Sequence, residues 1–318
     1  MNQSVICCIY NTEPLVRRTL ESLRKTASPF TEVILVDNHS PDEAARDLIY
    51  KQDWVKVVDP GKNLGCHDGW NYGFQYSTGR YVCKLDDDTE ILTPDWGSKM
   101  SEALRLCEDI AYVSADIDAK QANNYLTCER FGHTFEIPDR GIVGFSFVMF
   151  RREDVIRWGL MKTGLYRAAG GRPVAGDRLY GGEEVYFAQA AANEGKKIAH
   201  YPPVKCHHAD NAERHPFYPL WKYCYGYTAW TSKEMQDWID SGDAQKHCRC
   251  AIAHSASQAT TNDAELVMWL NLLVGFPCER DHALIEAVME RTKNGAVHEK
   301  CLAVLDSIAM GARKGMSS

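Results

Sequence analysis

The sequence lacks any apolar run of about 18 residues, the length that a transmembrane helix needs. It also lacks the charged opening and long apolar core of a secretory signal, because Glu13, Arg17 and Arg18 interrupt the first apolar stretch early. Internal repeats and low-complexity tracts do not stand out, so a repeat architecture is not expected. We therefore expect a protein with no transmembrane segment and a cytoplasmic location.

An excess of positive charge is also missing, because 36 Lys and Arg residues stand against 43 Asp and Glu residues, a formal net charge of −7. A protein that holds nucleic acid by neutralising phosphates usually has the opposite balance, so nucleic acid is not an expected partner. The 12 cysteines do not resemble a disulfide framework. Cys7, Cys8 and Cys83 lie inside apolar runs, which predicts buried free thiols in a reducing compartment.

The chain has 318 residues, of which 45% are hydrophobic and 25% charged, as in ordinary globular proteins. Apolar runs typical of buried strands alternate with helical spacing over the first two thirds, which predicts an α/β fold with a mostly parallel, doubly wound sheet. The strand-like runs cover residues 4–9, 32–36, 54–58, 81–85, 111–114 and 144–150. Helical spacing recurs at 264–276, 282–291 and 297–310. We therefore expect a catalytic domain over 1–215 and a helical C-terminal region over 216–318.

Three consecutive carboxylates follow the strand predicted at 81–85. Because a strand has period two, Asp86 and Asp88 should point the same way and Asp87 the other way. Two carboxylates on one side repel each other unless a cation lies between them, and oxygen ligands suit Mg²⁺ or Mn²⁺. The carboxyl end of a strand in an open α/β sheet is also where ligands bind. The alternative is an acidic, solvated turn.

Four motifs follow one another along the chain. They read S-V-I-C-C-I-Y-N at 4–11, V-I-L-V-D-N-H-S at 33–40, N-L-G-C-H-D-G-W-N-Y-G at 63–73 running into L-D-D-D-T at 85–89, and G-G-E-E-V-Y-F at 181–187. In this order they resemble a family 2 nucleotide-sugar glycosyltransferase with the GT-A fold, over residues 4 to about 210. The resemblance implies a Rossmann-like, mostly parallel sheet flanked by helices, followed here by the helical C-terminal region.

The resemblance also implies a pocket for a nucleotide-sugar donor. The residues at the matching positions are Tyr10, Asn11, Asp37, Asn63, Gly65, Asn71, Asp86 and Asp87. Asp37 stands where the family reads the nucleotide base, and a carboxylate can accept a hydrogen bond from uracil, so UDP is the expected nucleotide. The alternatives are that Asp37 only forms a turn and that the glycine-rich segment at 63–73 only packs a helix on the sheet.

The same resemblance assigns the chemistry. Asp86 and Asp88 would hold Mn²⁺ or Mg²⁺ against the donor diphosphate, and His207 or His208 would be a third ligand. Glu184 would take the proton from the acceptor hydroxyl in an inverting transfer, with Glu183 as the alternative base.

The acceptor could belong to a glycan, a lipid-linked sugar or a protein, and the C-terminal helices are expected to serve acceptor choice or oligomerisation. A glycine-rich stretch at 162–182 is expected to close over the donor. Two other functions stay open at this point, a nucleotidyltransferase and a catalytically inactive module that binds nucleotide-sugars. The sequence Y-N-T-E-P after the first strand lacks the basic glycine-rich phosphate loop of the former.

Overall fold

The computed structural model describes residues 2–10, 13–40, 42–117, 124–139, 141–161, 183–209 and 281–315, with scattered positions between 237 and 278. The chain divides into two compact units, residues 1–210 with 227–231, and residues 211–226 with 232–318. The domain boundary expected near residue 215 stays a prediction. The candidate site residues belong to the first unit.

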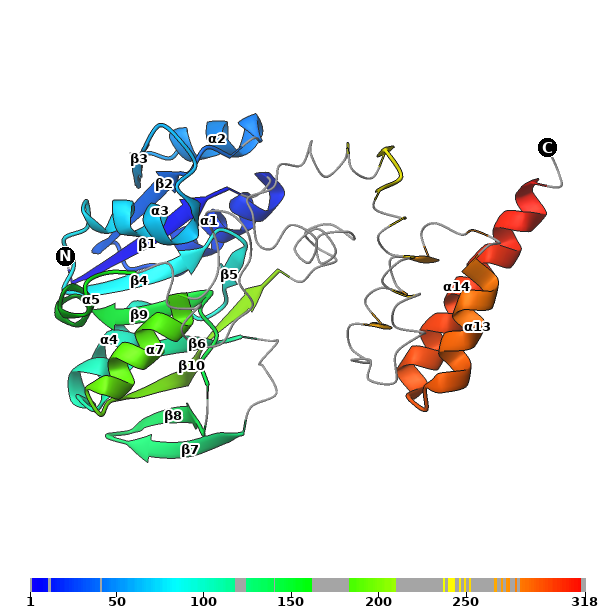
Figure 1. The fold of residues 1–318 in the computed structure, drawn as a ribbon. Helices are drawn as coiled ribbons and strands as arrows, with labels where there is room; N and C mark the ends of the chain where they lie inside the picture. Colours follow the sequence, from blue (N-terminus) through cyan, green and yellow to red (C-terminus); the bar gives the residue numbers. More distant parts are fainter. Residues whose placement is uncertain are drawn as a thin grey trace. The chain divides into compact units, whose positions relative to one another are not determined.

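One sheet of ten strands organises the described part of the first unit (Figure 1). The strands are β1 (Gln3–Ile9), β2 (Thr31–Asp37), β3 (Lys56–Val58), β4 (Tyr81–Asp86), β5 (Thr89–Ile91), β6 (Ile110–Ile117), β7 (Tyr125–Arg130), β8 (His133–Pro138), β9 (Phe147–Arg151) and β10 (Lys197–His208). Their order is β3-β2-β1-β4-β9-β6-β10-β8-β7, and β5 pairs with β10 outside this path.

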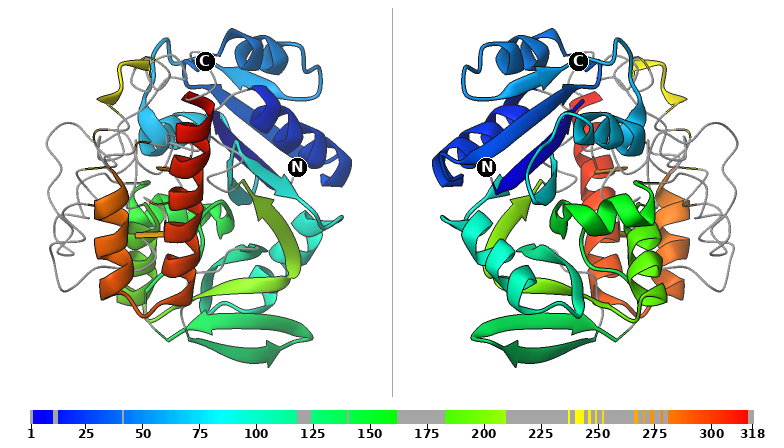
Figure 2. Two further views of the ribbon diagram at one scale, coloured as in Figure 1. Left: turned by 90° about the vertical axis from the view of Figure 1, so that its right-hand side faces the viewer. Right: turned by 90° about the vertical axis from the view of Figure 1, so that its left-hand side faces the viewer.

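The direction of the strands differs in part from the mostly parallel sheet that the sequence predicts. Strands β1 to β4 pair in parallel, and so do β6 and β10. However, β9 lies antiparallel between β4 and β6, so the sheet is mixed. The hairpin of β7 and β8 forms one edge of the sheet, at the opposite side from β3 (Figure 2). The fold class, α/β with helices on the sheet, is as expected.

Helices cover both faces of this sheet. One hydrophobic cluster joins the sheet to α1 (Glu13–Thr26), α2 (Glu43–Tyr50) and α4 (Trp96–Leu106). A second cluster joins the other face to α3 (Gly65–Phe74), α5 (Arg152–Trp158) and α7 (Glu183–Asn193). In β1, Cys7 belongs to the first cluster and Ile6 to the second. Burial on both faces explains why this strand is a continuous apolar run.

Helix α3 packs very closely on the sheet because of its glycines. A Cβ atom at Gly73 would lie 2.5 Å from Cγ2 of Ile6 and 2.8 Å from Cγ2 of Val36. Gly65, at the start of the helix, has a φ of 77°, which L-residues with side chains rarely adopt. The glycines at 65 and 73 are thus required by the backbone and by helix–sheet packing, respectively.

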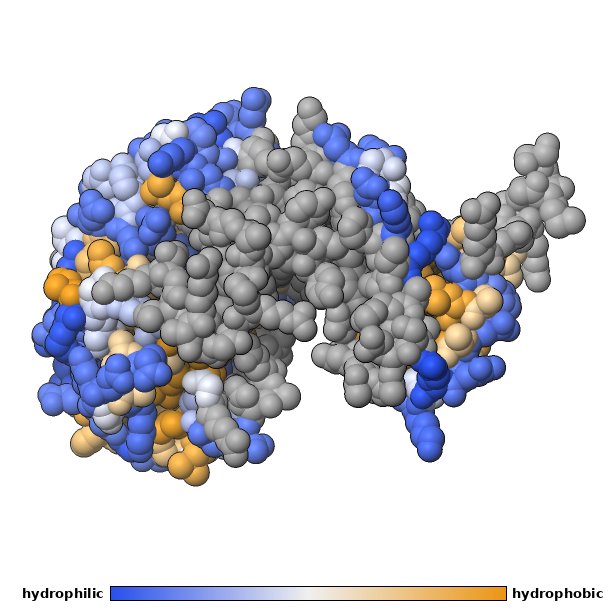
Figure 3. Space-filling model, viewed as in Figure 1, coloured by the Kyte–Doolittle hydropathy of each residue, from blue (hydrophilic) through white to orange (hydrophobic). Residues whose placement is uncertain are grey.

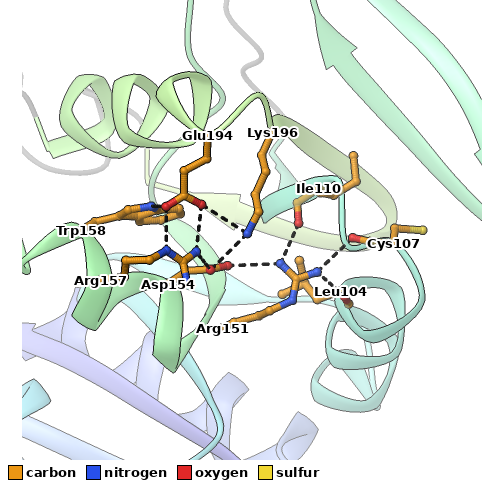
Figure 4. Close-up of polar contacts among 9 residues, drawn as sticks. All are labelled: Leu104, Cys107, Ile110, Arg151, Asp154, Arg157, Trp158, Glu194 and Lys196. Atoms are coloured by element: carbon orange, nitrogen blue, oxygen red, sulfur yellow. Dashed lines mark hydrogen bonds and ion pairs between the residues drawn. The ribbon is translucent and has the colours of Figure 1, made fainter.

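An ion-pair cluster ties together α5, the end of α7 and the loop after α4 (Figure 4). Arg151 donates to the carbonyl oxygens of Cys107 and Ile110, both at 2.9 Å. Asp154, whose side chain is 2% exposed, forms ion pairs with Arg151, Arg157 and Lys196. The negative charge of Asp154 is thus buried next to three cationic side chains, which offset the cost of removing it from water.

The exposed large apolar side chains of the first unit, among the described residues, lie on several different elements. On the face drawn in Figure 3, the coloured residues of this unit are mostly hydrophilic. Exposed apolar side chains include Phe30 and, on the β7–β8 hairpin, Leu126 and Phe131. Among the described residues, buried free thiols occur at Cys7, Cys83, Cys107, Cys206 and Cys301. The sequence predicts burial of Cys7 and Cys83 correctly, whereas Cys8, also expected to be buried, is only partly buried.

The second unit contains the helices α13 (His282–Arg291) and α14 (Gly295–Gly315), close to the ranges expected from the sequence. Apolar residues of both helices are buried, among them Ile285, Val288, Val304 and Ile308. Within the described residues, no helix of either unit combines the length and the apolar character that a membrane crossing requires.

Candidate active site

Two carboxylates and one imidazole meet at the carboxyl end of β4. Nε2 of His208 lies 3.2 Å from Oδ1 of Asp88 and 3.9 Å from Oδ2 of Asp86. One ligand atom from each of these three residues can be chosen so that all lie within 4.8 Å of one another. The group has the composition and the spacing of a site for a divalent cation.

Strand pairing brings these residues together from distant parts of the chain. Strand β5 follows the three acids and pairs antiparallel with the end of β10, so that His208 lies opposite Thr89. The amide of Ala209 donates to the carbonyl oxygen of Asp88 at 3.0 Å, which holds the two segments side by side. His207 is the preceding residue on β10 and lies opposite Glu90, and the cluster of ligand atoms does not include it. Of the two histidines expected as alternatives, the structure brings His208 to the carboxylates.

The electrostatics of the cluster also suit a cation. Burial raises the pKa of Asp86 above its usual value, and the negative charge of Asp88 adds to this rise. The positive charge of Lys84 opposes it. The side chain of Asp88 is only 6% exposed. Two carboxylates so close together carry a repulsion that a bound cation removes. Two carboxylate oxygens and one imidazole nitrogen are donors that Mn²⁺ accepts, and Mg²⁺ accepts the oxygens, so these residues fit either expected ion.

Asp87, the middle acid, is engaged elsewhere. It is buried, and its Oδ2 atom accepts a hydrogen bond of 2.6 Å from the backbone amide of Tyr10. This contact ties the segment after β4 to the end of β1. Asp87 therefore holds the backbone at Tyr10, while Asp86 and Asp88 share the cluster with His208. Asn11, the other residue expected there, lies outside the described residues.

Asp37 ends β2 with a carboxylate that is fully buried and fully engaged. One oxygen accepts from the amide of His39, and the other accepts from Nε of Arg46 and the hydroxyl of Tyr50, each at 3.1 Å. These contacts direct Asp37 toward α2 and its own turn. They are the contacts expected for the turn-forming alternative, and the base-reading role stays a prediction.

Asn38 is a positioning residue that the sequence interpretation did not single out. Its Oδ1 atom accepts from the amide of Leu64 at 2.8 Å, and its Nδ2 atom donates to the carbonyl oxygen of Gly65 at 3.1 Å. Asn63 adds a third contact, because its Oδ1 atom accepts from the amide of Gly65 at 2.7 Å. The two asparagines together fix the loop that starts α3. The sequence contains a signal for this role of Asn38, because a polar residue directly after a buried strand needs hydrogen-bond partners.

Asn71, from the same helix, holds a more distant segment. It donates to the carbonyl oxygen of Met161 at 2.9 Å and accepts from the Met161 amide at 3.1 Å. This amide-to-backbone pair fixes the residue just before the glycine-rich stretch at 162–182. That stretch, with the closing role expected for it, lies outside the described residues.

Glu184 lies in the first turn of α7, a helix anchored by aromatic contacts. Phe187 stacks on Phe145, with ring centroids 6.1 Å apart, and Phe145 lies 5.9 Å from Tyr112. Burial, and then the charge of Glu184, raise the pKa of Tyr112. Helix α7, which carries Glu184, thus packs on the side of the sheet covered by α3 and α5. The side chain of Glu183, the alternative base, lies outside the described residues.

Residues 4–160 match the sequence model of the family described as glycosyl transferase family 2. This stretch belongs to glycosyl transferase family 2. The chain is 30% identical over 118 residues to an uncharacterized glycosyltransferase of Haemophilus influenzae, covering 36% of each chain. It is 29% identical over 116 residues to the uncharacterized glycosyltransferase YibD of Escherichia coli, covering 36% of this chain and 33% of YibD. The matched region thus spans about a third of the length of these curated relatives.

Two solved structures share the fold at low identity. GalNAc-T7, crystallised with UDP, GalNAc and Mn²⁺, has a TM-score of 0.51 and 16% identity, over 65% of this chain and 44% of its own. The mannosyltransferase PcManGT of Pyrobaculum calidifontis, in complex with GDP-Man and Mn²⁺, has a TM-score of 0.50 and 15% identity, over 97% of this chain and 87% of its own. The fold of the family 2 domain is therefore of the GT-A type.

Proposed function

We propose that the protein transfers a sugar from a nucleotide-sugar, with UDP as the nucleotide, to an acceptor hydroxyl in a metal-dependent, inverting reaction. The observation that carries this proposal is the meeting of Asp86, Asp88 and His208 at the carboxyl end of β4 within a family 2 domain. The relatives named as glycosyltransferases and the solved structures with nucleotide-sugars or UDP and Mn²⁺ support it.

The proposed division of labour follows the chemistry of each group. Asp86, Asp88 and His208 would hold Mn²⁺ or Mg²⁺. Bound there, the ion supplies positive charge that stabilises the leaving diphosphate. Tyr10 and Asp87, joined by their hydrogen bond, would border the donor at the end of β1. Asn38, Asn63 and Asn71 would fix the backbone around the donor through the contacts at both ends of α3.

Glu184 is the proposed general base. It would take the proton from the acceptor hydroxyl as that oxygen attacks the anomeric carbon and the bond from this carbon to the diphosphate breaks. The attack from the opposite face inverts the configuration. Glu183 remains the alternative base. The acceptor, a glycan, a lipid-linked sugar or a protein, is a further part of the proposal, and so is the choice of UDP over GDP and dTDP.

Ligand-induced stabilisation tests the proposal directly. We expect UDP and UDP-sugars to raise the melting temperature in the presence of Mn²⁺ and to have little effect without it. At a ligand concentration 100 times the dissociation constant, binding stabilises the folded state by about 2.7 kcal/mol, which is easily measured. The same panel should contain GDP- and dTDP-sugars.

Matched variants make the panel specific. Asp88→Ala should lose the stabilisation that depends on Mn²⁺, whereas Glu90→Gln, an acid two residues further along and outside the ligand cluster, should keep it. A larger shift with GDP- or dTDP-sugars would overturn the choice of UDP. Equal shifts in both variants with and without Mn²⁺ would overturn the metal site.

A further inference from the structure

A buried lysine lies directly behind the metal-ligand candidates. Lys84 is two residues before Asp86 on β4, on the same face of the strand, and its side chain is 4% exposed. Its Nζ atom contacts Oδ1 of Asp86 and donates to the carbonyl oxygen of Phe145 at 3.0 Å. It also lies 5.5 Å from the centre of the Phe145 ring. Burying an ammonium group in a central strand is costly unless it is paired, so this placement requires a partner such as Asp86.

The two oxygens of Asp86 are thereby given different surroundings. Oδ1 is held by Lys84, whereas Oδ2 is the oxygen that lies 3.9 Å from His208. The carboxylate is oriented before any cation arrives, with Oδ2 toward the ligand cluster. Lys84 itself offers no acceptor for a metal ion. Its positive charge therefore acts on a bound ion from the far side of the Asp86 carboxylate.

The balance of charge shows the consequence. Asp86, Asp87 and Asp88 contribute three negative charges, and Lys84 cancels one of them. A bound divalent cation then makes the total charge of the three aspartates, Lys84 and the ion zero, with His208 counted as neutral. Without Lys84, the three aspartates and the bound ion would keep a net negative charge. A negative group repels a diphosphate, and a more negative empty group attracts a free cation more strongly.

We propose that Lys84 is a positioning residue that orients Asp86 and shifts the site's preference from a free divalent cation toward the cation together with a diphosphate. This inference rests on the proposed function, because it takes the same three residues as metal ligands. It predicts opposite changes in two affinities when the charge is removed, whereas a simple loss of structure would weaken both.

The experiment measures binding of Mn²⁺ alone by electron paramagnetic resonance, and then binding of UDP at saturating Mn²⁺ by calorimetry. For Lys84→Met we expect binding of Mn²⁺ alone to tighten by about tenfold and UDP binding to weaken by about tenfold, because a unit charge one carboxylate away is removed. Lys84→Arg keeps the charge and should stay within about threefold of the wild type in both. Lys51→Met, which removes a lysine whose side chain is 73% exposed, is the control for net charge.

Weaker or unchanged binding of Mn²⁺ alone by Lys84→Met would overturn the role of Lys84 while leaving the proposed function intact. Absence of Mn²⁺ binding by the wild type would instead overturn the proposed metal site, and the inference with it. If Lys84→Met does not fold, Lys84→Gln removes the same charge, keeps a donor for the Phe145 carbonyl oxygen, and is judged by the same two outcomes.

Discussion

Nε2 of His208 lies 3.2 Å from Oδ1 of Asp88, although the histidine ends β10 and the aspartate follows β4. The amide of Ala209 and the carbonyl oxygen of Asp88 join the same two segments at 3.0 Å. Backbone pairing therefore fixes the approach of the two side chains, so the cluster is present before a ligand binds. A prearranged set of ligands reduces the cost of ordering them at the moment of binding.

The two adjacent histidines give the sharpest comparison at this site. His208→Ala removes one of three ligand candidates and should weaken Mn²⁺ binding by at least about tenfold, the scale on which even outer partners change metal affinity. His207→Ala changes a residue outside the ligand cluster and should leave Mn²⁺ binding within about twofold of the wild type. Isothermal titration with Mn²⁺ measures both, and a stronger effect of His207→Ala would contradict the geometry.

Asn38 should matter for stability as well as for the shape of the site. Asn38→Ala leaves the Leu64 amide and the Gly65 carbonyl oxygen without the partner that holds them. An unsatisfied buried polar group costs about 1–3 kcal/mol, and the Leu64 contact is only part-buried, so we expect the free energy of unfolding to fall by about 2–4 kcal/mol. Urea denaturation measures this fall.

The matched control is Gln75→Ala, at an exposed position directly after α3. Surface substitutions usually change stability by less than about 0.5 kcal/mol. Similar values for Asn38→Ala and Gln75→Ala would mean that the Asn38 contacts contribute little to stability.

The sequence predicts strands and helices well where burial leaves a simple pattern. The runs at 4–9 and 81–85 are strands in the structure because both faces of the sheet are covered by helices. The antiparallel direction of β9 could not be predicted, because a continuous apolar run is the same pattern for a parallel and for an antiparallel strand. Strand β10 continues through the prolines at 202 and 203, with a register shift between Tyr201 and Lys205.

The candidate site was predictable as a set of motifs but not as a set of contacts. A strand period predicts that Asp86 and Asp88 share a side, but in the structure β4 ends at Asp86 and Asp88 lies in the turn before β5, so the turn places it. The choice of His208 over His207 depends on the register of β10 with β5. Lys84 was hidden inside an apolar strand, although a charge at such a position signals a buried partner. The engagement of Asp37 by α2 depends on packing that no local pattern reveals.

Acid should weaken the ion-pair cluster of Figure 4 in a defined range of pH. The hydrogen bond from Arg157 and, to a smaller extent, the one from Trp158 lower the pKa of Glu194 to about 2, against some opposition from burial. A depressed pKa in the folded state means that this stabilisation is complete above the ordinary pKa of about 4.5 and is lost as the pH falls toward about 2.

The matched variant is Glu194→Gln, which cannot ionise. We expect it to be less stable than the wild type at pH 7, with the difference shrinking between about pH 4.5 and 2. Urea denaturation at several pH values measures the difference, which would be independent of pH if the Glu194 charge had no role.

The buried thiols should resist alkylation in the folded protein. Burial, followed by the charge of Asp87, raises the pKa of Cys7, and burial raises that of Cys83. Because the thiolate is the reactive form, iodoacetamide should label neither residue until the protein unfolds, whereas the partly exposed Cys128 should react in the folded protein. Peptide mass spectrometry gives the labelling rates, and equal rates for Cys83 and Cys128 in native buffer would contradict the described burial.

The release of UDP from UDP-sugars tests the central claim, a metal-dependent glycosyltransferase site at Asp86, Asp88 and His208, most directly. A coupled assay should show release by the wild type and by Glu90→Gln with Mn²⁺, and background rates for both after chelation. Asp88→Ala and Glu184→Gln should fall to background with Mn²⁺ present. Equal rates in the wild type, Asp88→Ala and Glu184→Gln, with and without Mn²⁺, would contradict the account.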